Sequence, residues 1–444
     1  MPALLTIAAA EPGFSFADSW ALGLLFLALA LFAAIGALSH QQERAFSPSL
    51  VYLALGAVGA GGLWLLDIRP LDPMRDSSLL EHVTELAILV AVFGTGLRLH
   101  RAHELRHWGH VAKLLALVMP LTIAIVALFG VHVMGLSLGA AIVLGSILAP
   151  TDPVLAGDVG VGAPGEEEGR TEAEFALTAE AAANDGLGTP FLLLGILVAE
   201  VERGGEVGEA LAEWLVADVL YAIVVAVAIG ASGYAIAALF VRLRDAHLLL
   251  HKLDGWAGVA TALAIFALAE AAGAYGFVAG FVGGLAFRRY EYEHEYNRGV
   301  HDGMENVEKF LEMAVILLLG SMLTLAGLQA PGTSGWLLAP LLLLGIRPLS
   351  VALSLPGSGF SARSQVYLAW FGVKGVASIN YVAIAIGAGV LSAGEQARVF
   401  WTVVACVMFS IVVHGVSAEL VTRRTLGTVV EAEEAAAPGS GAPY

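Results

Sequence analysis

The sequence predicts an all-α integral membrane protein with about thirteen transmembrane helices. Hydrophobic residues make up 58% and charged residues 14% of its 444 residues, whereas soluble domains have roughly 45–50% apolar and about 25% charged residues. Such a chain cannot cover a soluble globule with polar surface, so a soluble enzyme and a disordered scaffold are poor fits. The net charge of −17 also differs from that of a nucleic-acid-binding protein, which carries clustered basic residues.

The thirteen helices come from the lengths of the apolar runs, because a membrane helix needs about 20 mostly apolar residues to cross a core of about 30 Å. The ninth run is short and rich in glycine, and could be a full span, a half-span or a continuation of the eighth. The runs are residues 20–38, 50–66, 79–98, 112–134, 136–161, 173–199, 212–241, 254–272, 275–287, 307–327, 335–355, 364–391 and 398–421.

The distribution of basic residues supports this count and gives an orientation. Of the 22 lysines and arginines, 16 lie in one alternate set of connections and four in the other, and two lie inside apolar runs. Because basic residues concentrate on the cytoplasmic side, we expect the N-terminus outside and the C-terminus in the cytoplasm of a bacterial-type inner (plasma) membrane. The small and acidic residues 428–444 are expected to form a disordered cytoplasmic tail.

Ionisable side chains inside membrane spans are costly and usually mark function. Three of those found here, Glu81, Asp218 and Glu312, lie near expected helix ends and can reach water. Glu85 is intermediate, and Glu270 is expected deep in the eighth helix. His414 is expected to be a packing residue. The remaining ones are Asp152, Glu180, Asp185, Arg347 and Lys374.

Asp152 lies between Pro150 and Pro153 in the fifth helix. Each proline removes a backbone donor and restricts the residue before it, so we expect the helix to break there in mid-membrane. A break of this kind is tolerated where it lines a cavity, and transporters use it to bind ions. The alternative is a simple kink with a buried, hydrogen-bonded aspartate.

Asp185 lies inside the sixth helix, which is antiparallel to the fifth. If the fifth helix ends near Val161 and the sixth begins near Ala173, Asp152 and Asp185 lie roughly 14 and 18 Å from the connecting loop. Two carboxylates at similar depth cannot both ionise cheaply in a low dielectric. Either a proton or a cation can neutralise them, which favours cation/proton exchange. A passive cation channel and an intramembrane aspartyl hydrolase are the alternatives.

The two buried basic residues need carboxylate partners or helix ends. Glu180 is expected to pair with Arg347 or Lys374 as a structural brace that holds the sixth helix. Gly372 and Gly375 flank Lys374 and weaken the twelfth helix, and Lys374 can compensate the negative end of a broken helix. The fifth and twelfth helices are separated by seven positions in the order of helices. An odd separation gives the two helices opposite orientations in the membrane, as inverted repeats with crossing broken helices require.

At these residues the chain resembles the monovalent cation:proton antiporter superfamily, in particular its NhaP-like sodium/proton exchanger branch. The resemblance implies a homodimer, a core of residues of about 112–199 and 335–421, interface helices of about 20–98 and 254–327, and one transporter domain over 1–427. The stretches that carry it are APTDPVLAGDVGVGAPGE (149–166), FALTAEAAANDGLGTPF (175–191), GIRPLSV (345–351) and YLAWFGVKGVASINYVAIAI (367–386).

The resemblance also implies site roles. Asp185 would carry the cation and the proton, and Asp152 and the backbone carbonyl of Thr151 would be ligands. Asn184 stands where other branches carry a second aspartate, which implies one-for-one exchange. The transported Na⁺ and H⁺ are substrates, so we expect a transporter without a cofactor and not an enzyme.

The chain departs from the family pattern at three positions. Gly94 replaces a glutamate of the third helix, Ala181 replaces a serine four residues before Asp185, and Lys374 replaces an arginine. The first two changes remove oxygen ligands, which makes K⁺ an alternative to Na⁺ as the transported cation. The third removes the fork-like pairing of an arginine.

Overall fold

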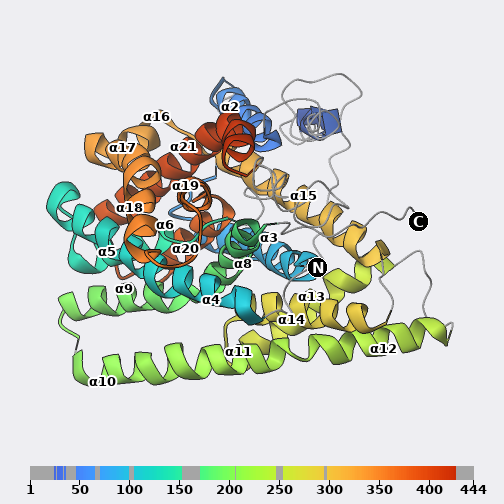
Figure 1. Cartoon of the computed structure of the whole chain (residues 1–444). Coiled ribbons are helices and arrows are strands. Elements are labelled where there is room, and N and C mark those ends of the chain that lie inside the picture. The colour runs from blue at the N-terminus through green and yellow to red at the C-terminus, as the bar shows by residue number, and fades with distance from the viewer. Residues whose placement is uncertain are drawn as a thin grey trace, which may run out of the picture.

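The computed structural model describes residues 25–26, 28–33, 35–36, 47–65, 71–99, 105–152, 171–205, 207–246, 254–294 and 298–426, and these residues are organised as helices (Figure 1). The expected tail 428–444 lies outside the described residues, as do residues 153–161 of the fifth expected helix and most of the loop that follows it. Within the described ranges no β-strand occurs, so the expected all-α class is confirmed.

The first half of the chain supplies α6 (Leu138–Leu148), which Asp152 follows, and α8 (Glu172–Leu187), on which Asp185 lies. Several helices of this half join end to end through a π-helical turn (η), so that one apolar run of the sequence corresponds to two or three elements. The elements are α2 (Pro48–Leu65), α3 (Ser77–Arg98), α4 (Leu105–Lys113), η1 (Leu114–Val118), α5 (Met119–Phe129), η2 (Gly130–Met134), α6 (Leu138–Leu148), α8 (Glu172–Leu187) and α9 (Thr189–Glu202).

The second half begins with a long row of helices, α10 to α12, which lies along one edge of the molecule in Figure 1. The elements are α10 (Val207–Glu213), η3 (Trp214–Tyr221), α11 (Ala222–Gly230), α12 (Gly233–Asp245), α13 (Asp254–Ala271), α14 (Gly276–Glu293), α15 (Arg298–Ser321), α16 (Leu325–Gln329), α17 (Gly332–Leu341), η5 (Leu342–Ile346), α18 (Arg347–Ser354), α19 (Ala362–Trp370), α20 (Val376–Gly387) and α21 (Ala393–Thr425).

Seven helical runs within the described residues are long and apolar enough to cross a membrane. Three shorter apolar helices, Leu138–Leu148, Gly255–Ala271 and Val376–Gly387, accompany them. Two of these are short because of a break inside a longer apolar run: α6 ends at one break and α20 begins at the other. The exact count of thirteen spans stays a prediction. The seven runs are Pro48–Leu65, Ser77–Arg98, Arg106–Met134, Glu172–Glu202, Gly208–Arg244, Gly332–Ser354 and Ala393–Thr425.

The glycine-rich ninth run forms a helix of its own, α14, separated from α13 by a turn at residues 272–275. Its glycines serve close packing against α3. A Cβ added at Gly96 of α3 would lie 2.6 Å from the carbonyl oxygen of Phe281, and Gly284 faces Gly96 in the same contact. Small residues at such crossings let two membrane helices approach backbone to backbone.

Two helices of the fold break where the sequence predicts. The first break follows α6, where Ala149 to Asp152 leave the helix, and the second separates α19 from α20 at residues 371–375. Helices α6 and α20 pack against each other, and α21 contacts both. The two breaks therefore lie beside one another in the interior of the molecule.

Candidate functional site

Helix α6 carries a charge of the appropriate sign at each end. At its N-terminus, the Glu202 carboxylate accepts hydrogen bonds from the backbone N–H groups of Leu138 and Gly139, both at 3.0 Å. At its C-terminus, the Lys374 Nζ donates to the carbonyl oxygens of Ala149 (2.9 Å) and Pro150 (2.7 Å). An anion at the N-terminus and a cation at the C-terminus both stabilise the helix dipole. The break is thus supported rather than left with orphan carbonyls.

Asp152 plays the matching role at the second break. Its Oδ2 accepts a hydrogen bond of 2.6 Å from the backbone N–H of Val376, the first residue of α20, and its own N–H donates to the carbonyl of Val373 at 2.9 Å. The carboxylate therefore lies at the positive end of α20, where an anion is favoured. Lys374 is fixed from the other side, because Ser410 Oγ accepts from its backbone N–H at 2.8 Å.

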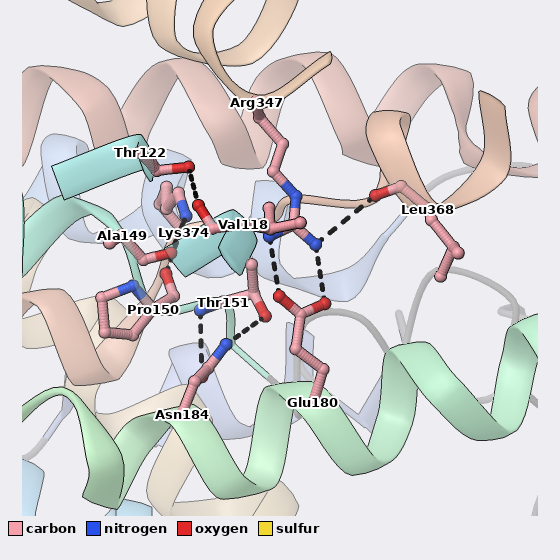
Figure 2. Close-up of polar contacts among 10 residues, drawn as sticks. All are labelled: Val118, Thr122, Ala149, Pro150, Thr151, Glu180, Asn184, Arg347, Leu368 and Lys374. Carbon is pink, nitrogen blue, oxygen red and sulfur yellow. Dashed lines mark hydrogen bonds and ion pairs between the residues drawn. The ribbon is translucent and has the colours of Figure 1, made fainter. Parts of the chain in front are cut away.

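Helix α8 brings the remaining site residues alongside the first break. It begins with a capping box, in which the Thr171 hydroxyl accepts from the Glu174 N–H and the Glu174 carboxylate accepts from the Thr171 N–H. Four turns further on, the Asn184 side chain makes two hydrogen bonds to Thr151. Its Oδ1 accepts from the Thr151 N–H at 3.2 Å and its Nδ2 donates to the Thr151 hydroxyl at 3.0 Å (Figure 2). Asn184 thus holds the unwound segment in place.

Asp185 follows Asn184 directly and faces a pocket. Its backbone carbonyl accepts a short hydrogen bond from the Tyr381 hydroxyl of α20. Its side chain is buried, with the residue 1% exposed, yet its Oδ1 has no hydrogen-bond partner among the residues that the structure describes. A buried oxygen of this kind is costly unless something binds it. The charges of Asp152 and Lys374 both act on this carboxylate.

The expected brace is formed by Glu180 and Arg347, and Lys374 takes no part in it. Arg347 Nη1 and Nη2 donate to the two carboxylate oxygens of Glu180, each at 2.7 Å, and Nη2 also approaches the carbonyl of Leu368 at 3.5 Å (Figure 2). Both side chains are fully buried. The paired planar groups fix α8 against α18, which holds Asp185 at a defined height.

Asp152 and Asp185 both line one small, partly open pocket. The spacing argument had placed the two carboxylates at similar depth, and the structure brings them to one cavity. Thr151 and Asn184 adjoin Asp152 and Asp185 in the chain, and Lys374 lies in the second break beside Val376, which also lines the pocket. The other lining residues are Ala87, Ile88, Ala91, Glu308, Glu312 and Val376.

Two expectations about other intramembrane carboxylates are wrong. Glu312 does not lie near a helix end, because α15 runs from Arg298 to Ser321. It is buried, and its Oε1 accepts a hydrogen bond of 2.6 Å from the Ser49 hydroxyl. Glu270 is not deep in a helix, because α13 ends one residue later. Its Oε1 accepts from the N–H of Gly276 at 2.9 Å and so caps the start of α14.

Sequence reasoning also missed residues that the site uses. Glu308 lines the pocket, Tyr381 binds the Asp185 carbonyl, and Ser410 binds the Lys374 backbone. Tyr381 lies in the stretch 367–386 that carries the family resemblance, which is a signal that was available. Glu308 lies in a charged, mostly acidic run, where a solvated helix face is the ordinary interpretation.

His414 is buried against the second break. Its Nε2 lies 2.9 Å from the carbonyl of Trp370, the last residue of α19, and its Nδ1 lies 2.9 Å from the carbonyl of Ser410. Its ring is therefore used to satisfy the end of a helix, in keeping with the expected packing role.

With this geometry established, comparison with known proteins decides the family. The family model described as "Sodium/hydrogen exchanger, transmembrane" matches residues 9–424. The chain belongs to the sodium/hydrogen exchanger family. The match covers nearly the whole chain and confirms the resemblance seen in the motifs. Exchangers of this family are transporters, and the chain is an integral membrane protein.

Two curated antiporters share part of the exchanger sequence. The Na(+)/H(+) antiporter 2 of Zygosaccharomyces rouxii is 30% identical over 155 residues, which cover 34% of this chain and 19% of that protein. The Na(+)/H(+) antiporter of Saccharomyces cerevisiae is 25% identical over 185 residues, which cover 41% of this chain and 18% of that protein. The exchanger chain thus matches about a fifth of the length of these relatives.

Solved structures confirm the expected antiporter fold. The sodium proton antiporter MjNhaP1 from Methanocaldococcus jannaschii at pH 8 has a TM-score of 0.64 and 17% identity, covering 89% of this chain and 99% of that one. An electron-microscopy structure of the same antiporter has a TM-score of 0.69 and 19% identity, covering 92% and 98% of the two chains. At this identity the likeness concerns the fold of the exchanger.

Proposed function

We propose that this chain is a secondary active antiporter that exchanges Na⁺ for H⁺, one for one, at Asp185 and Asp152. The observation that carries the proposal is the Asp185 Oδ1, which is buried, lines the pocket and has no hydrogen-bond partner among the described residues. A buried carboxylate oxygen in that position needs a proton or a cation. Family membership and the two antiporters that share part of the sequence support the same activity.

The two aspartates have different roles in the proposed exchange. Asp152 is held by the N–H of Val376, so its charge is fixed at the end of α20, whereas Asp185 changes its occupant. In this mechanism Asp185 binds either H⁺ or the cation, and Asp152 and the carbonyl of Thr151 supply further oxygen ligands. The empty, charged form is expensive in the low-dielectric interior, so only the occupied forms cross between the two faces. Exchange is then obligatory.

Asn184 supports the one-for-one stoichiometry that the family resemblance implies. An amide at this position adds no second titrating carboxylate, and its hydrogen bonds to Thr151 engage both of its polar atoms. In this proposal one proton exchanges for one monovalent cation, and the cycle carries no net charge. The cation and the proton are substrates, and the proposal includes no cofactor and no covalent chemistry.

A K⁺/H⁺ antiporter of the same fold is the second candidate. Ala181 lies one turn before Asp185 and is fully buried, so the helix offers no side-chain oxygen at that level. A site with fewer oxygen ligands is wider and less rigid, and discriminates less against the larger cation. Gly94 of α3 also offers no side-chain ligand.

The assembly and orientation complete the proposal. We place the N-terminus outside and the C-terminus in the cytoplasm, with residues of about 112–199 and 335–421 as the core and about 20–98 and 254–327 as the interface of a homodimer. The two breaks and all the residues that hold them belong to the core ranges. Helices α3 and α15, which line the pocket from the other side, belong to the interface ranges.

The test is transport by the purified protein in proteoliposomes that contain a pH-sensitive dye. Pulses of Na⁺, Li⁺ or K⁺ should each report whether that cation drives proton movement, and a membrane potential should leave the rate unchanged. Asp185→Asn should abolish exchange and Asp152→Asn should reduce it by at least about tenfold, because each removes a charge that faces the ion. Glu419→Gln, on the exposed end of α21, is the matched control.

Full exchange in the double variant Asp152→Asn/Asp185→Asn would contradict the proposal. A current that follows the cation gradient would instead indicate a channel, and K⁺ preferred over Na⁺ would select the second candidate.

A further inference from the structure

The pocket of Asp152 and Asp185 has a second acidic wall on a different helix. Glu308 and Glu312 of α15 line the same cavity. They lie four residues apart on one face of the helix, about 6 Å along its axis. Both residues are buried. The pocket therefore joins two pairs of carboxylates, one from the broken helices and one from an unbroken helix.

Glu308 is occupied by an internal cation, the guanidinium of Arg98. Arg98 Nη1 donates to Glu308 Oε2 at 2.7 Å and Arg98 Nη2 donates to Glu308 Oε1 at 3.0 Å. The Glu308 side chain is 7% exposed, but the Arg98 side chain is 25% exposed. Arg98 is therefore the more accessible member of the pair. A long, partly exposed arginine side chain can swing its charge into water without leaving its helix.

The backbone beside this ion pair leaves room for it. A Cβ added at Gly94 of α3 would lie 2.9 Å from Glu308 Oε2 and 3.3 Å from Arg98 Nη1. A side chain at that position would require the charged ends of Glu308 and Arg98 to shift. The sequence thus keeps a glycine one turn before Arg98, where the pair needs the space.

The rest of α3 contributes no charge to the pocket. Its lining residues are Ala87, Ile88 and Ala91, which are apolar. Arg98 is the last residue of α3, and Glu308 lies in the first half of α15. Glu308, beside this end of α3, therefore lines the same pocket as Asp185, whose Oδ1 has no hydrogen-bond partner among the described residues.

We propose that Glu308 is an entry ligand for the transported cation and that Arg98 is its built-in competitor, which the cation displaces before it reaches Asp185. Carboxylate oxygens are hard ligands suited to a monovalent metal cation, and the bidentate guanidinium occupies those same oxygens. When no cation is present, the Arg98 guanidinium neutralises Glu308 and occupies its carboxylate oxygens. The inference rests on the proposed exchange and assigns it an additional ligand outside the two breaks.

The decisive measurement is the KM for Na⁺ in proteoliposomes, or for K⁺ if that is the preferred cation. Glu308→Gln should raise the KM roughly tenfold with the maximal rate retained, since one attractive charge is lost in a site of intermediate dielectric. Arg98→Gln should lower the KM severalfold, because the competitor is gone. Glu305→Gln is the matched control on the same helix, since Glu305 pairs with Lys309 and does not line the pocket; its KM should stay within twofold.

A charge swap separates this role from a structural one. If the pair only ties α3 to α15, Arg98→Glu combined with Glu308→Arg should restore transport, because the ion pair is kept. If Glu308 is an entry ligand, the swap places a positive charge on the pocket wall, and the KM should rise further than in Glu308→Gln. Thermal stability of each variant in detergent shows whether it is folded.

Rescue by the swap would overturn the inference, and so would a KM unchanged in both Glu308→Gln and Arg98→Gln. Either result leaves the proposed function intact if the unmodified protein exchanges cations and Asp185→Asn does not. Absence of exchange in the unmodified protein would be a failure of the proposed function itself.

Discussion

At the scale of single residues, the pair of Arg347 and Glu180 shows what a charge inside the membrane requires. Each group is desolvated, and each is matched by a partner with two parallel hydrogen bonds. Removing one member of a buried pair leaves an uncompensated charge, which is much more costly than losing an exposed pair. The same reasoning explains why Lys374 lies against two carbonyl oxygens.

Glu180→Gln should therefore lower the free energy of unfolding by about 3–5 kcal/mol. Glu419 forms an ion pair with Arg423 on the exposed part of α21, and Glu419→Gln should change stability by no more than about 0.5 kcal/mol. Thermal unfolding in detergent measures both. Arg347→Lys should fall between them, since it keeps the charge but not the fork. Equal effects of Glu180→Gln and Glu419→Gln would contradict a bracing role.

For single residues, the sequence predicts the site best where a residue such as proline directly changes the backbone conformation. Pro150 and Pro153 predict the first break. The spacing along two antiparallel helices predicts that Asp185 lies at a similar depth. The partner of a long side chain is harder to predict. Ser49 binds Glu312 from 263 residues away in the chain, and Arg98 reaches Glu308 over 210. No local pattern encodes contacts of that kind.

At the scale of elements, glycine decides how closely two helices approach. The contact of α3 and α14 places Gly96 against the backbone of Phe281 and Gly284. Other glycines of the chain, such as Gly61 of α2, face open space. The composition alone cannot distinguish these two uses of glycine, because it does not show which helix face is packed.

Gly96→Ala should lower stability by about 1–3 kcal/mol, because the added methyl group overlaps the backbone of α14. Gly61→Ala should leave stability equal or raise it by up to about 1 kcal/mol, since alanine is the better helix former and meets no neighbour. The two variants make the same chemical change in two helices. Thermal unfolding that reverses this order would contradict the packing of α3 on α14.

At the scale of the whole molecule, composition and helix length predict the membrane class and most helix positions. The ends of helices are less predictable where polar residues extend an apolar run. The tenth expected run begins at residue 307, whereas α15 begins at Arg298, because residues 298–306 are mostly polar or charged but still helical. The basic-residue bias predicts the orientation, which needs a direct measurement.

Cysteine labelling can measure the orientation in intact cells, because Cys406 is the one natural cysteine and is buried. Glu209 and Ala362 are both exposed, in the first turns of α10 and α19. A membrane-impermeant maleimide added from outside should label the Glu209→Cys variant and not the Ala362→Cys variant. The unmodified protein is the background control. The opposite pattern would reverse the predicted topology.

The hydrogen bonds between the two breaks have a mechanical consequence. Asp152 is joined to Val373 and Val376, and Lys374 is joined to Ala149 and Pro150, so four contacts tie one interruption to the other. Neither broken segment can shift alone without breaking several of these hydrogen bonds. An ion bound at Asp152 would then move together with both broken segments as one rigid unit. Relative motion during transport is expected where this unit contacts the surrounding helices.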